Sequence, residues 1–441
     1  MNRCILLGLA AGFGAMLAAC GVIDPINGPA RQNGNADFSV YVAMGTSLGA
    51  GVESGGLVER HQVHSYAYLF AQQAQAASFT IPSISDSGLS PLLVLRSLQP
   101  LVITPASTPG SPTNFAQPTS YHNMSIPGAL LVDVLDSTVA GYNRGLFPVI
   151  QRGRGLIIQQ ALGLGPTFIS FEYGANEVLG PALQGSGTSP FSPATFAAMY
   201  TTAMNGIAAG APNAKLVLFN APDVTTIPHF TTFPAFTVSL STGNPVPLEG
   251  ADGPLTAGDL VLLSAGPLIA QGYGIPAGGF NYVNPSAGSN GQPLQENRIL
   301  RASEVAELQA TVAAYNAIID SVATERGAAL VDIHGLLQEI ATNGVRYGAV
   351  VYTNDFITGG VFSLDGVHPT DLGYALMANQ MIGAVNAKFG ATIPPVNLGA
   401  AATQGRYALR RTDEGSTTKP LVFGLDGVLH DLYGVRGAPV P

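Results

Sequence analysis

A chain of 441 residues is long enough for one large domain or two, since domains typically contain ~100–200 residues, and it can bury a sizeable core. Charged residues make up only 10% of the sequence, against roughly 25% in an average soluble protein. The net charge is −9 and lysine and arginine do not cluster. This argues against nucleic acid as a partner, because phosphate binding needs a basic cluster.

The first residues have the pattern of a secretory signal. Arg3 precedes the apolar stretch 5–16, which is followed by Leu17-Ala18-Ala19-Cys20. A cysteine here resembles the lipobox of bacterial lipoproteins, which implies cleavage after residue 19 and acylation of Cys20 by palmitate-like chains; a plain signal peptide with a chance cysteine is the alternative. We therefore expect a lipoprotein signal peptide at 1–19, a polar tether at 20–37, and a protein anchored to a membrane of the bacterial cell envelope, facing the periplasm or the exterior.

After the tether, apolar strands alternate with helices over a predicted domain of residues 38–395. Buried strands are expected at Phe38–Met44, Pro166–Gly174, Lys215–Asn220 and Ala328–Ile333. Helices are expected at Tyr66–Ala74, Pro193–Ala209, Ser303–Arg326 and Asp371–Phe389. The last helix is predicted to be amphipathic, with Leu372, Ala375, Leu376, Ile382 and Val385 on its apolar face. The alternation predicts an α/β fold with a central parallel sheet covered by helices on both faces.

Three stretches depart from this alternation. Residues 81–120 are rich in Pro, Ser and Thr and are expected to form loops with short strands. Residues 225–295 form a large Gly/Pro-rich insertion, which is too long for a structureless loop. A lid over a substrate and a surface insertion with its own small hairpins are equally compatible with it. Residues 396–441 form a C-terminal tail in which 421–427 could pair as a hairpin.

Four short segments contain the residues that could carry chemistry. Ser47 directly follows the first strand, and glycines at 45, 49 and 51 allow a sharp turn there. The second segment is 123–129, and the third is 173–177, after the second strand. The fourth, 363–370, contains Asp365 and His368. A serine becomes a nucleophile when a histidine and an acid activate it, so these segments together predict nucleophilic catalysis.

The order and local context of these segments resemble the SGNH hydrolases, also called the GDSL esterase/lipase family. The resemblance implies a flavodoxin-like three-layer α/β/α sandwich and ester hydrolysis through an acyl-serine, with no metal or organic cofactor. It implies that Ser47 is the nucleophile, Asp365 the acid and His368 the base. It also implies an oxyanion hole made of the Gly128 backbone N–H and the Asn176 side-chain amide. Such a hole fits the chemistry, because a tetrahedral intermediate needs preorganised donors.

Two positions depart from the family pattern. The first segment usually reads Gly-Asp-Ser-Leu, and Thr46 stands in place of that aspartate. The third usually reads Gly-x-Asn-Asp, and Glu177 stands in place of its last residue. Both changes leave the reacting residues in place, so we expect them to affect substrate placement more than the type of reaction.

Other polar residues are weaker candidates. His61 and His64 have a spacing that a metal pair could use, but we interpret them as surface histidines near the active-site loop. Glu172 could be an acid that supports the site, although a strand-end residue without such a role is the preferred interpretation. The pair His430-Asp431 is attributed to chance.

The sequence thus predicts a serine esterase acting on lipid or short-chain acyl esters. Its expected partners are an ester substrate, either an acyl lipid or an acylated glycan, and a membrane reached through Cys20. A carbohydrate O-deacetylase would use the same residues, and a transacylase would pass the acyl group to a second alcohol. A non-catalytic lipoprotein that keeps the scaffold for binding glycan or lipid is the rival from another class, because Thr46 and Glu177 depart from the family pattern.

Overall fold

A computed structural model of the chain describes residues 32–98, 101–136, 145–404 and 421–422. The expected lipobox at Cys20 and the pair His430-Asp431 lie outside these residues. Among the described helices, none combines the length and the hydropathy that crossing a membrane requires.

Four parallel strands form the central sheet. They follow one another in space in the order β1, β4, β5, β12, with bounds Tyr41–Met44, Phe168–Phe171, Lys215–Phe219 and Ala329–Val331. The register sets Tyr41 opposite Phe168 and Phe168 opposite Lys215. All four predicted strands are confirmed, each shorter than its apolar run. Residues of β1 and β4 are buried throughout, as expected for a parallel sheet covered on both faces.

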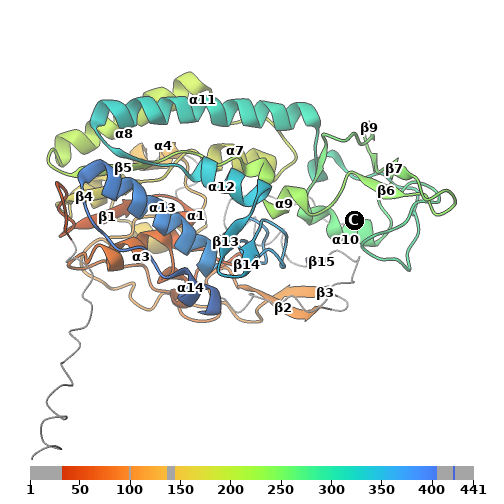
Figure 1. The fold of residues 1–441 in the computed structure, drawn as a ribbon, viewed down its shortest axis with the longest axis horizontal. Coiled ribbons are helices and arrows are strands. Elements are labelled where there is room, and N and C mark those ends of the chain that lie inside the picture. Colours follow the sequence, from red (N-terminus) through yellow and green to blue (C-terminus); the bar gives the residue numbers. More distant parts are fainter. Residues whose placement is uncertain (1–31, 99–100, 137–144, 405–420, 423–441) are drawn as a thin grey trace, which may run out of the picture. The chain divides into compact units, whose positions relative to one another are not determined.

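Helices cover both faces of the sheet (Figure 1). One layer holds α4 (Leu131–Leu135), α6 (Ile157–Leu162), α7 (Asn176–Ala182), α8 (Pro193–Gly210) and α11 (Ala302–Arg326). The other holds α3 (Tyr66–Gln73), α13 (Asp371–Phe389) and α14 (Leu398–Gln404), near the short α1 (Ser47–Ala50). The predicted three-layer α/β/α arrangement and its four main helices are therefore confirmed.

Helix α13 differs from its prediction as an amphipathic helix. Every residue from Asp371 to Ala378 is buried, so this half of the helix has no solvent-facing side. It packs against α3, α12 (Ile333–Thr342), α14 and β12. The pattern of apolar residues was correct, but small residues such as Gly373 and Ala375 let neighbours close over the face that the sequence suggested was open.

Residues 122–126 lie on the outer side of β1, opposite β4. Ala43 bridges Asn123 in parallel, and the Met124 amide donates to the Ala43 carbonyl at 2.8 Å. The Ile126 amide donates to the Gly45 carbonyl at 2.9 Å, at the end of the strand. After β1 the chain therefore first returns on one side of that strand, as residues 122–126, and later on its other side, as β4. Ligands bind at such a reversal of strand order in open α/β sheets.

An aromatic cluster packs beneath these strands. The Phe168 ring centroid lies 4.8 Å from Phe38, 5.8 Å from Tyr41 and 5.4 Å from Phe70. The Tyr41 hydroxyl and the Ser170 hydroxyl lie 2.8 Å apart, which joins β1 to β4 through side chains as well. Side-chain contacts thus hold β1 and β4 together near their first residues, Tyr41 and Phe168.

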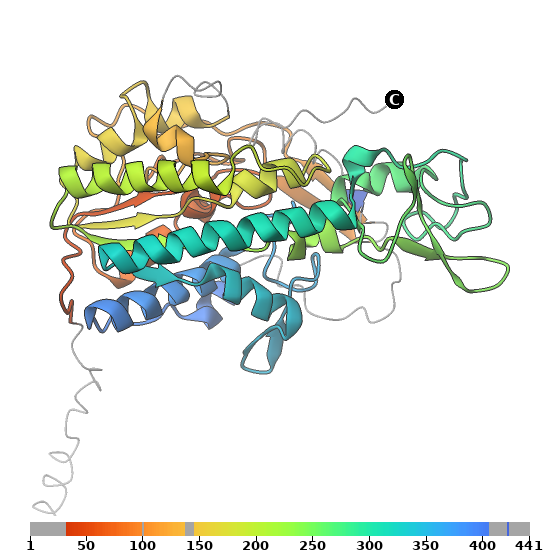
Figure 2. The same cartoon turned by 90° about the horizontal axis from the view of Figure 1, so that it is seen from above.

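Smaller elements occupy the remaining stretches. The insertion at 225–295 contains the antiparallel pair β6–β7, the pair β8–β9 and the helices α9 and α10, beyond the edge of the main sheet (Figure 2). The tail residues Leu421–Val422 (β15) pair in parallel with β3, and the rest of the stretch 421–427 that could pair as a hairpin lies outside the described residues. The bounds of the other short elements are α2 Glu59–Gln62, β2 Leu93–Leu98, β3 Leu101–Pro105, α5 Phe147–Gln151, α9 Pro228–Thr231, β6 Phe236–Val238, β7 Pro245–Pro247, β8 Glu249–Gly250, β9 Gly253–Pro254, β10 Leu260–Val261, α10 Gly266–Ala270, β11 Ile299–Leu300, β13 Val345–Tyr347 and β14 Val350–Tyr352, with 3-10 turns at Val224–Thr226, Leu263–Ala265 and Glu296–Arg298.

Candidate active site

The first three candidate segments meet at one edge of the sheet. Ser47 begins α1 directly after β1, Asn176 begins α7 after β4, and Gly128 follows the segment on the outer side of β1. The carboxyl ends of neighbouring parallel strands lie at the same edge, so residues more than a hundred positions apart come together there. The backbone of Gly128 has φ +75°, a left-handed conformation that favours glycine.

The loop that carries Ser47 is held by the buried carboxylate of Glu172. The Thr46 amide donates to Glu172 Oε2 at 2.9 Å, and the Thr46 hydroxyl donates to Oε1 at 2.9 Å. A Cβ atom on Gly45 would lie 2.8 Å from Glu172 Oε2, so the loop and the carboxylate can approach only because residue 45 is glycine. The interpretation of Glu172 as a strand-end residue without such a role is therefore wrong. Its signal in the sequence is a carboxyl residue at the end of a mostly apolar strand.

Burial controls the charge state of Glu172. Burial raises its pKa to about 8, against the lowering effect of the Thr46 hydrogen bonds. Its side chain therefore carries a proton over much of the neutral range. A protonated carboxyl group here holds the Thr46 loop without placing a full negative charge beside Ser47.

Glu177 joins the second and third segments. Its Oε1 accepts the Leu131 amide at 2.6 Å, at the start of α4. Burial raises the pKa of Glu177 to about 7, although the Leu131 amide acts in the opposite direction. Glu177 is fully buried and is not among the residues that line the cavity described below. The departure from the family pattern at this position therefore affects the packing of the fold and not the wall of the cavity.

Asn176 lies against the Gly128 segment. Its Nδ2 donates to the Ala129 carbonyl at 2.9 Å, which fixes the orientation of the amide. An amide nitrogen carries two N–H groups, so this bond leaves a second donor, and Asn176 also lines the cavity beside Ser47. The two residues expected to form an oxyanion hole are thus adjacent.

Asp365 and His368 form a buried pair before α13. Asp365 Oδ2 lies 2.7 Å from His368 Nδ1 and also accepts the Gly55 amide at 2.7 Å. Asp365 Oδ1 accepts the backbone amides of Val367 and His368, each at 2.8 Å. Burial alone would raise the pKa of Asp365, but the attraction and hydrogen bond of His368 and these amides together lower it. Asp365 is therefore charged at neutral pH and orients the imidazole of His368.

Backbone hydrogen bonds close a hairpin around Asp365 and His368 and so hold the pair in place. The Ser363 amide donates to the His368 carbonyl at 2.8 Å, and the Thr370 amide donates to the Val361 carbonyl at 2.8 Å. The Thr370 side chain then caps α13. On the other side, the Ser54 amide donates to Ser363 Oγ at 2.8 Å, which joins this hairpin to the loop that follows α1.

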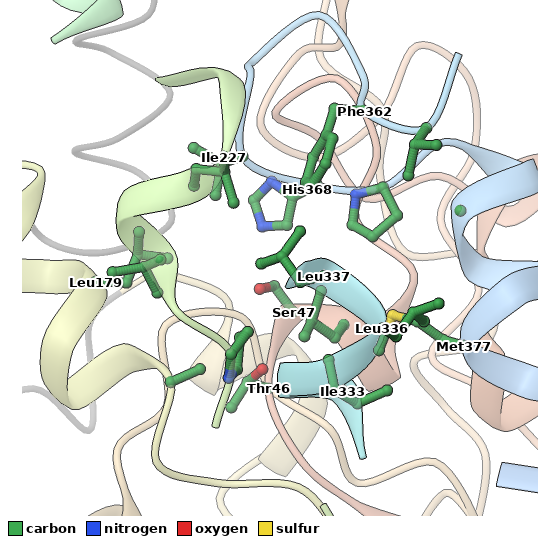
Figure 3. Close-up of a pocket in the computed structure, with 18 of the residues that line it drawn as sticks. Thr46, Ser47, Leu179, Ile227, Ile333, Leu336, Leu337, Phe362, His368 and Met377 are labelled. Atoms are coloured by element: carbon green, nitrogen blue, oxygen red, sulfur yellow. The ribbon is translucent and has the colours of Figure 1, made fainter. Parts of the chain in front are cut away.

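Ser47 and His368 line the same cavity (Figure 3). The cavity has a volume of about 80 Å³, and Thr46 and Asn176 are the other polar residues on its wall. Asp365 and Gly128 do not line it. The rest of the wall is aliphatic or aromatic for the most part and comes from α1, α7, α12, α13 and the loops between the main elements: Leu48, Leu179, Val224, Ile227, Ile333, Leu336, Leu337, Ile340, Val361, Phe362, Val367 and Met377.

A second group of titratable residues lies behind the hairpin. Glu53, His61 and Asp371 each offer one ligand atom, and these atoms all lie within 4.8 Å of one another. The interpretation of His61 as a surface histidine is wrong, because only 14% of its side chain is exposed. The sequence spacing could not reveal this, since Asp371 comes from a helix far along the chain.

Replacing Glu172 by glutamine is expected to change how stability depends on pH. The folded-state pKa of about 8 exceeds the ordinary value of 4.5, so the folded protein binds the extra proton and its stability falls as the pH rises between these values. Glu172→Gln mimics the protonated form at every pH. The difference in the free energy of unfolding between about pH 5 and about pH 8 should therefore shrink by a few kcal/mol, measured by urea denaturation.

Glu325→Gln is the control for this measurement, because the Glu325 side chain is 67% exposed. It should leave the pH profile of stability unchanged. A Glu172→Gln profile that is as steep as that of the wild-type protein contradicts the assignment of this titration to Glu172.

Comparisons with known proteins place the chain in a family. Residues 41–381 match the family model of the GDSL-like lipase/acylhydrolases. No curated protein matches by sequence. Three solved structures resemble this one: a GDSL-like lipase from Parabacteroides merdae (13% identity, TM-score 0.36, covering 80% of this chain and 97% of that one), an extracellular lipase from Streptomyces rimosus (13%, 0.33, 79% and 98%) and phospholipase A1 from Streptomyces albidoflavus (15%, 0.31, 79% and 98%). With most of its length matched by the family model, the chain belongs to the GDSL-like lipase/acylhydrolases, the SGNH hydrolases, and is a carboxylic ester hydrolase.

Proposed function

We propose that this hydrolase cleaves acyl esters through an acyl-enzyme on Ser47. The observation that carries the proposal is the buried pair of His368 and Asp365, 2.7 Å apart, with Ser47 and His368 on the wall of one apolar cavity. A serine, an imidazole and a carboxylate that orients the imidazole are the parts that serine acyl transfer needs.

The first half of the reaction forms the acyl-enzyme. Ser47 Oγ attacks the ester carbonyl carbon while the second ring nitrogen of His368, Nε2, takes the hydroxyl proton. Asp365 stabilises the imidazolium, because its lowered pKa keeps it negatively charged. The tetrahedral intermediate then collapses, the bond to the alcohol oxygen breaks, and His368 gives its proton to the leaving alcohol.

The second half repeats these steps with water. His368 takes a proton from the water as its oxygen attacks the acyl carbon, and the bond to Ser47 Oγ breaks. His368 returns the proton to Ser47, and the carboxylic acid leaves. In both halves the negative oxygen would receive the second N–H of Asn176 and the Gly128 amide. Loss of one such donor typically costs ~3–4 kcal/mol of transition-state stabilisation.

The wall of the cavity supports an acyl chain as the part of the substrate that it binds. Leu179, Leu336, Leu337 and Met377 offer only carbon and sulfur to a ligand, and no acidic, lysine or arginine side chain lines the cavity. Burial of each CH₂ group in such surroundings contributes about 0.8 kcal/mol. We therefore propose fatty-acyl esters, lipids included, as the substrate class. A carbohydrate O-deacetylase would gain nothing from these side chains.

The N-terminal sequence supports a place in the bacterial cell envelope. Leu17-Ala18-Ala19-Cys20 gives a site for acylation, and the low content of charged residues suits an enzyme that works beside lipid. We propose that acyl chains on Cys20 hold the enzyme at a membrane, where its substrate is concentrated.

Ser47→Ala and His368→Ala are expected to lower kcat for p-nitrophenyl butyrate by about 10⁴-fold or more, because members of a catalytic triad act as one unit. A fluorophosphonate probe should label the wild-type protein at Ser47, located by peptide mass spectrometry. Ser47→Ala should remain unlabelled.

Ser264→Ala is the matched control, since Ser264 is also buried but does not line the cavity. It should retain both activity and labelling. Wild-type protein that neither turns over the ester nor takes the label overturns the catalytic proposal and favours a binding lipoprotein.

The length of the acyl chain is expected to set the rate. From p-nitrophenyl acetate through butyrate to octanoate, kcat/KM should rise about fourfold per CH₂ until the cavity is filled, because ~0.8 kcal/mol is available for each group. Leu337→Asn should flatten this rise, and Leu337→Met, which keeps volume and polarity, should preserve it. A preference for acetate in the wild-type protein would instead identify a deacetylase.

A further inference from the structure

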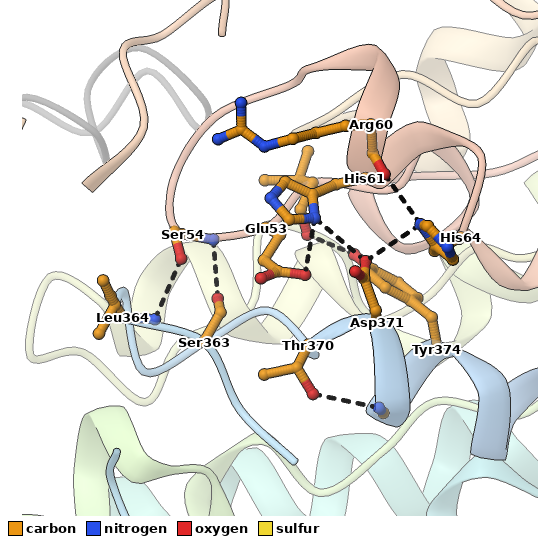
Figure 4. Close-up of polar contacts among 12 residues, drawn as sticks. Glu53, Ser54, Arg60, His61, His64, Ser363, Leu364, Thr370, Asp371 and Tyr374 are labelled. Carbon is orange, nitrogen blue, oxygen red and sulfur yellow. Dashed lines mark hydrogen bonds and ion pairs between the residues drawn. The ribbon is translucent and has the colours of Figure 1, made fainter. Parts of the chain in front are cut away.

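Glu53, His61 and Asp371 form a cluster in which the three side chains point toward one another (Figure 4). None of the three lines the cavity of Ser47. Glu53 follows α1, His61 lies in α2, and Asp371 is the first residue of α13. Glu53 and Asp371 are buried, and His61 is mostly so. Three elements that are distant in sequence thus direct a nitrogen and two carboxylates toward one point.

The distances between the atoms match the edges of a coordination shell. His61 Nδ1 lies 3.1 Å from Asp371 Oδ1 and 3.3 Å from Glu53 Oε2. Ligands that surround one ion tetrahedrally at ~2.0–2.1 Å lie roughly 3.3–3.4 Å from one another. The three atoms could therefore bind a common ion after small movements of the side chains.

Glu53 is the observation that points to a missing ligand. Its residue exposure is 0%, and its carboxylate oxygens make no hydrogen bond of good geometry with the described residues, although Oε2 lies at ion-pair distance, 3.3 Å, from His61 Nδ1. His61 Nδ1 makes its hydrogen bond with Asp371 Oδ1 instead. Leaving a buried polar group unsatisfied costs ~1–3 kcal/mol, and more when the group is charged. A cation between Glu53 and Asp371 would give these buried carboxylate oxygens a partner.

The surroundings of the cluster fit a metal centre. His64 Nδ1 lies 3.6 Å from Asp371 Oδ1 and 2.8 Å from the Arg60 carbonyl, so His64 approaches Asp371 from outside the three candidate ligands. Outer residues of this kind orient the ligands of a metal ion. The partial exposure of His61 leaves a route by which an ion could enter.

We propose that Glu53, His61 and Asp371 bind one divalent transition-metal ion. An imidazole nitrogen with two carboxylates favours Zn²⁺ and ions like it over Ca²⁺ or Mg²⁺, which prefer oxygen ligands alone. A water molecule completes the coordination. The proposal does not depend on the esterase mechanism, because none of its three ligands lines the cavity of Ser47.

A bound ion would join the two loops that position the catalytic acid. Glu53 lies two residues before Gly55, whose amide donates to Asp365, and Asp371 lies three residues after His368. The ion is therefore expected to act on structure, fixing one loop to the other, and takes no part in bond breaking.

Isothermal titration of Zn²⁺ into full-length protein, cleared of metal with EDTA, tests the proposal. We expect one site per chain that Glu53→Gln and His61→Gln each weaken by more than the ~10–100-fold caused by loss of an outer residue. Glu59→Gln is the matched control, because Glu59 lies in the same helix as His61, is exposed and undergoes the same substitution as Glu53 without belonging to the cluster. It should bind Zn²⁺ as the wild-type protein does.

Two further measurements keep the outcome decisive. Zn²⁺ should raise the Tm of the wild-type and Glu59→Gln proteins but not that of Glu53→Gln. If Glu53→Gln does not fold, His61→Gln, at a partly exposed position, replaces it in this measurement. Co²⁺ bound in place of Zn²⁺ should give a d–d spectrum without thiolate charge transfer, which separates this site from Cys4 and Cys20. No binding by the wild-type protein, or equal binding by all variants, overturns the proposal; a protonated Glu53 bonded to Asp371 then accounts for the cluster.

Discussion

The site depends on the position of β1 between two parallel neighbours. With β4 on one side and residues 122–126 on the other, the three chain segments end at the same edge of the sheet. Each segment then turns away, and Ser47, Gly128 and Asn176 are the residues at or just after those turns. Since backbone hydrogen bonds fix the register of all three segments, the relative placement of these residues is a property of the sheet rather than of flexible loops.

Charges are scarce in this chain, and several of them are buried near the site. Glu53, Glu172, Glu177, Asp365 and Asp371 are all buried, although burial of a carboxylate is costly. The surroundings of Asp365, Glu172 and Glu177 shift their pKa values in opposite directions. Asp365 has a histidine and several amides as donors and its pKa is lowered, whereas Glu172 and Glu177 have fewer donors and their pKa values are raised. Protonated carboxyl groups can support the Ser47 loop without opposing the negative charge that develops during ester cleavage, while Asp365, whose lowered pKa keeps it charged, lies behind the imidazole that it must stabilise.

The sequence was sufficient for the main elements of the fold and for Ser47, Asn176 and His368, the three candidate residues that line the cavity. Apolar runs predicted the strands, with glycine marking the ends of the first two, and the order of Ser47, Asn176, Asp365 and His368 identified the family. The roles of these residues in the reaction stay predictions. What the sequence could not supply were contacts between distant positions. Nothing near Glu172 shows that its carboxylate reaches Thr46, and nothing near His61 shows that Asp371 and Glu53 surround it. Side-chain patterning along one element also failed where several elements close over it, as they do over the first half of α13.

The loop after α1 and the hairpin before α13 are joined at two levels, and this arrangement explains how a loop can position a catalytic acid. At the first level, the amides of Ser54 and Gly55 donate to Ser363 and Asp365. At the second, the Tyr374 hydroxyl donates to the Val52 carbonyl, which joins the helix that follows the hairpin to the turn that follows Ser47. Any movement of His368 away from Ser47 would have to break contacts of both kinds. The nucleophile loop and the acid–base hairpin therefore move as one body, and the distance between their reacting groups is set by buried contacts that neither segment could provide alone.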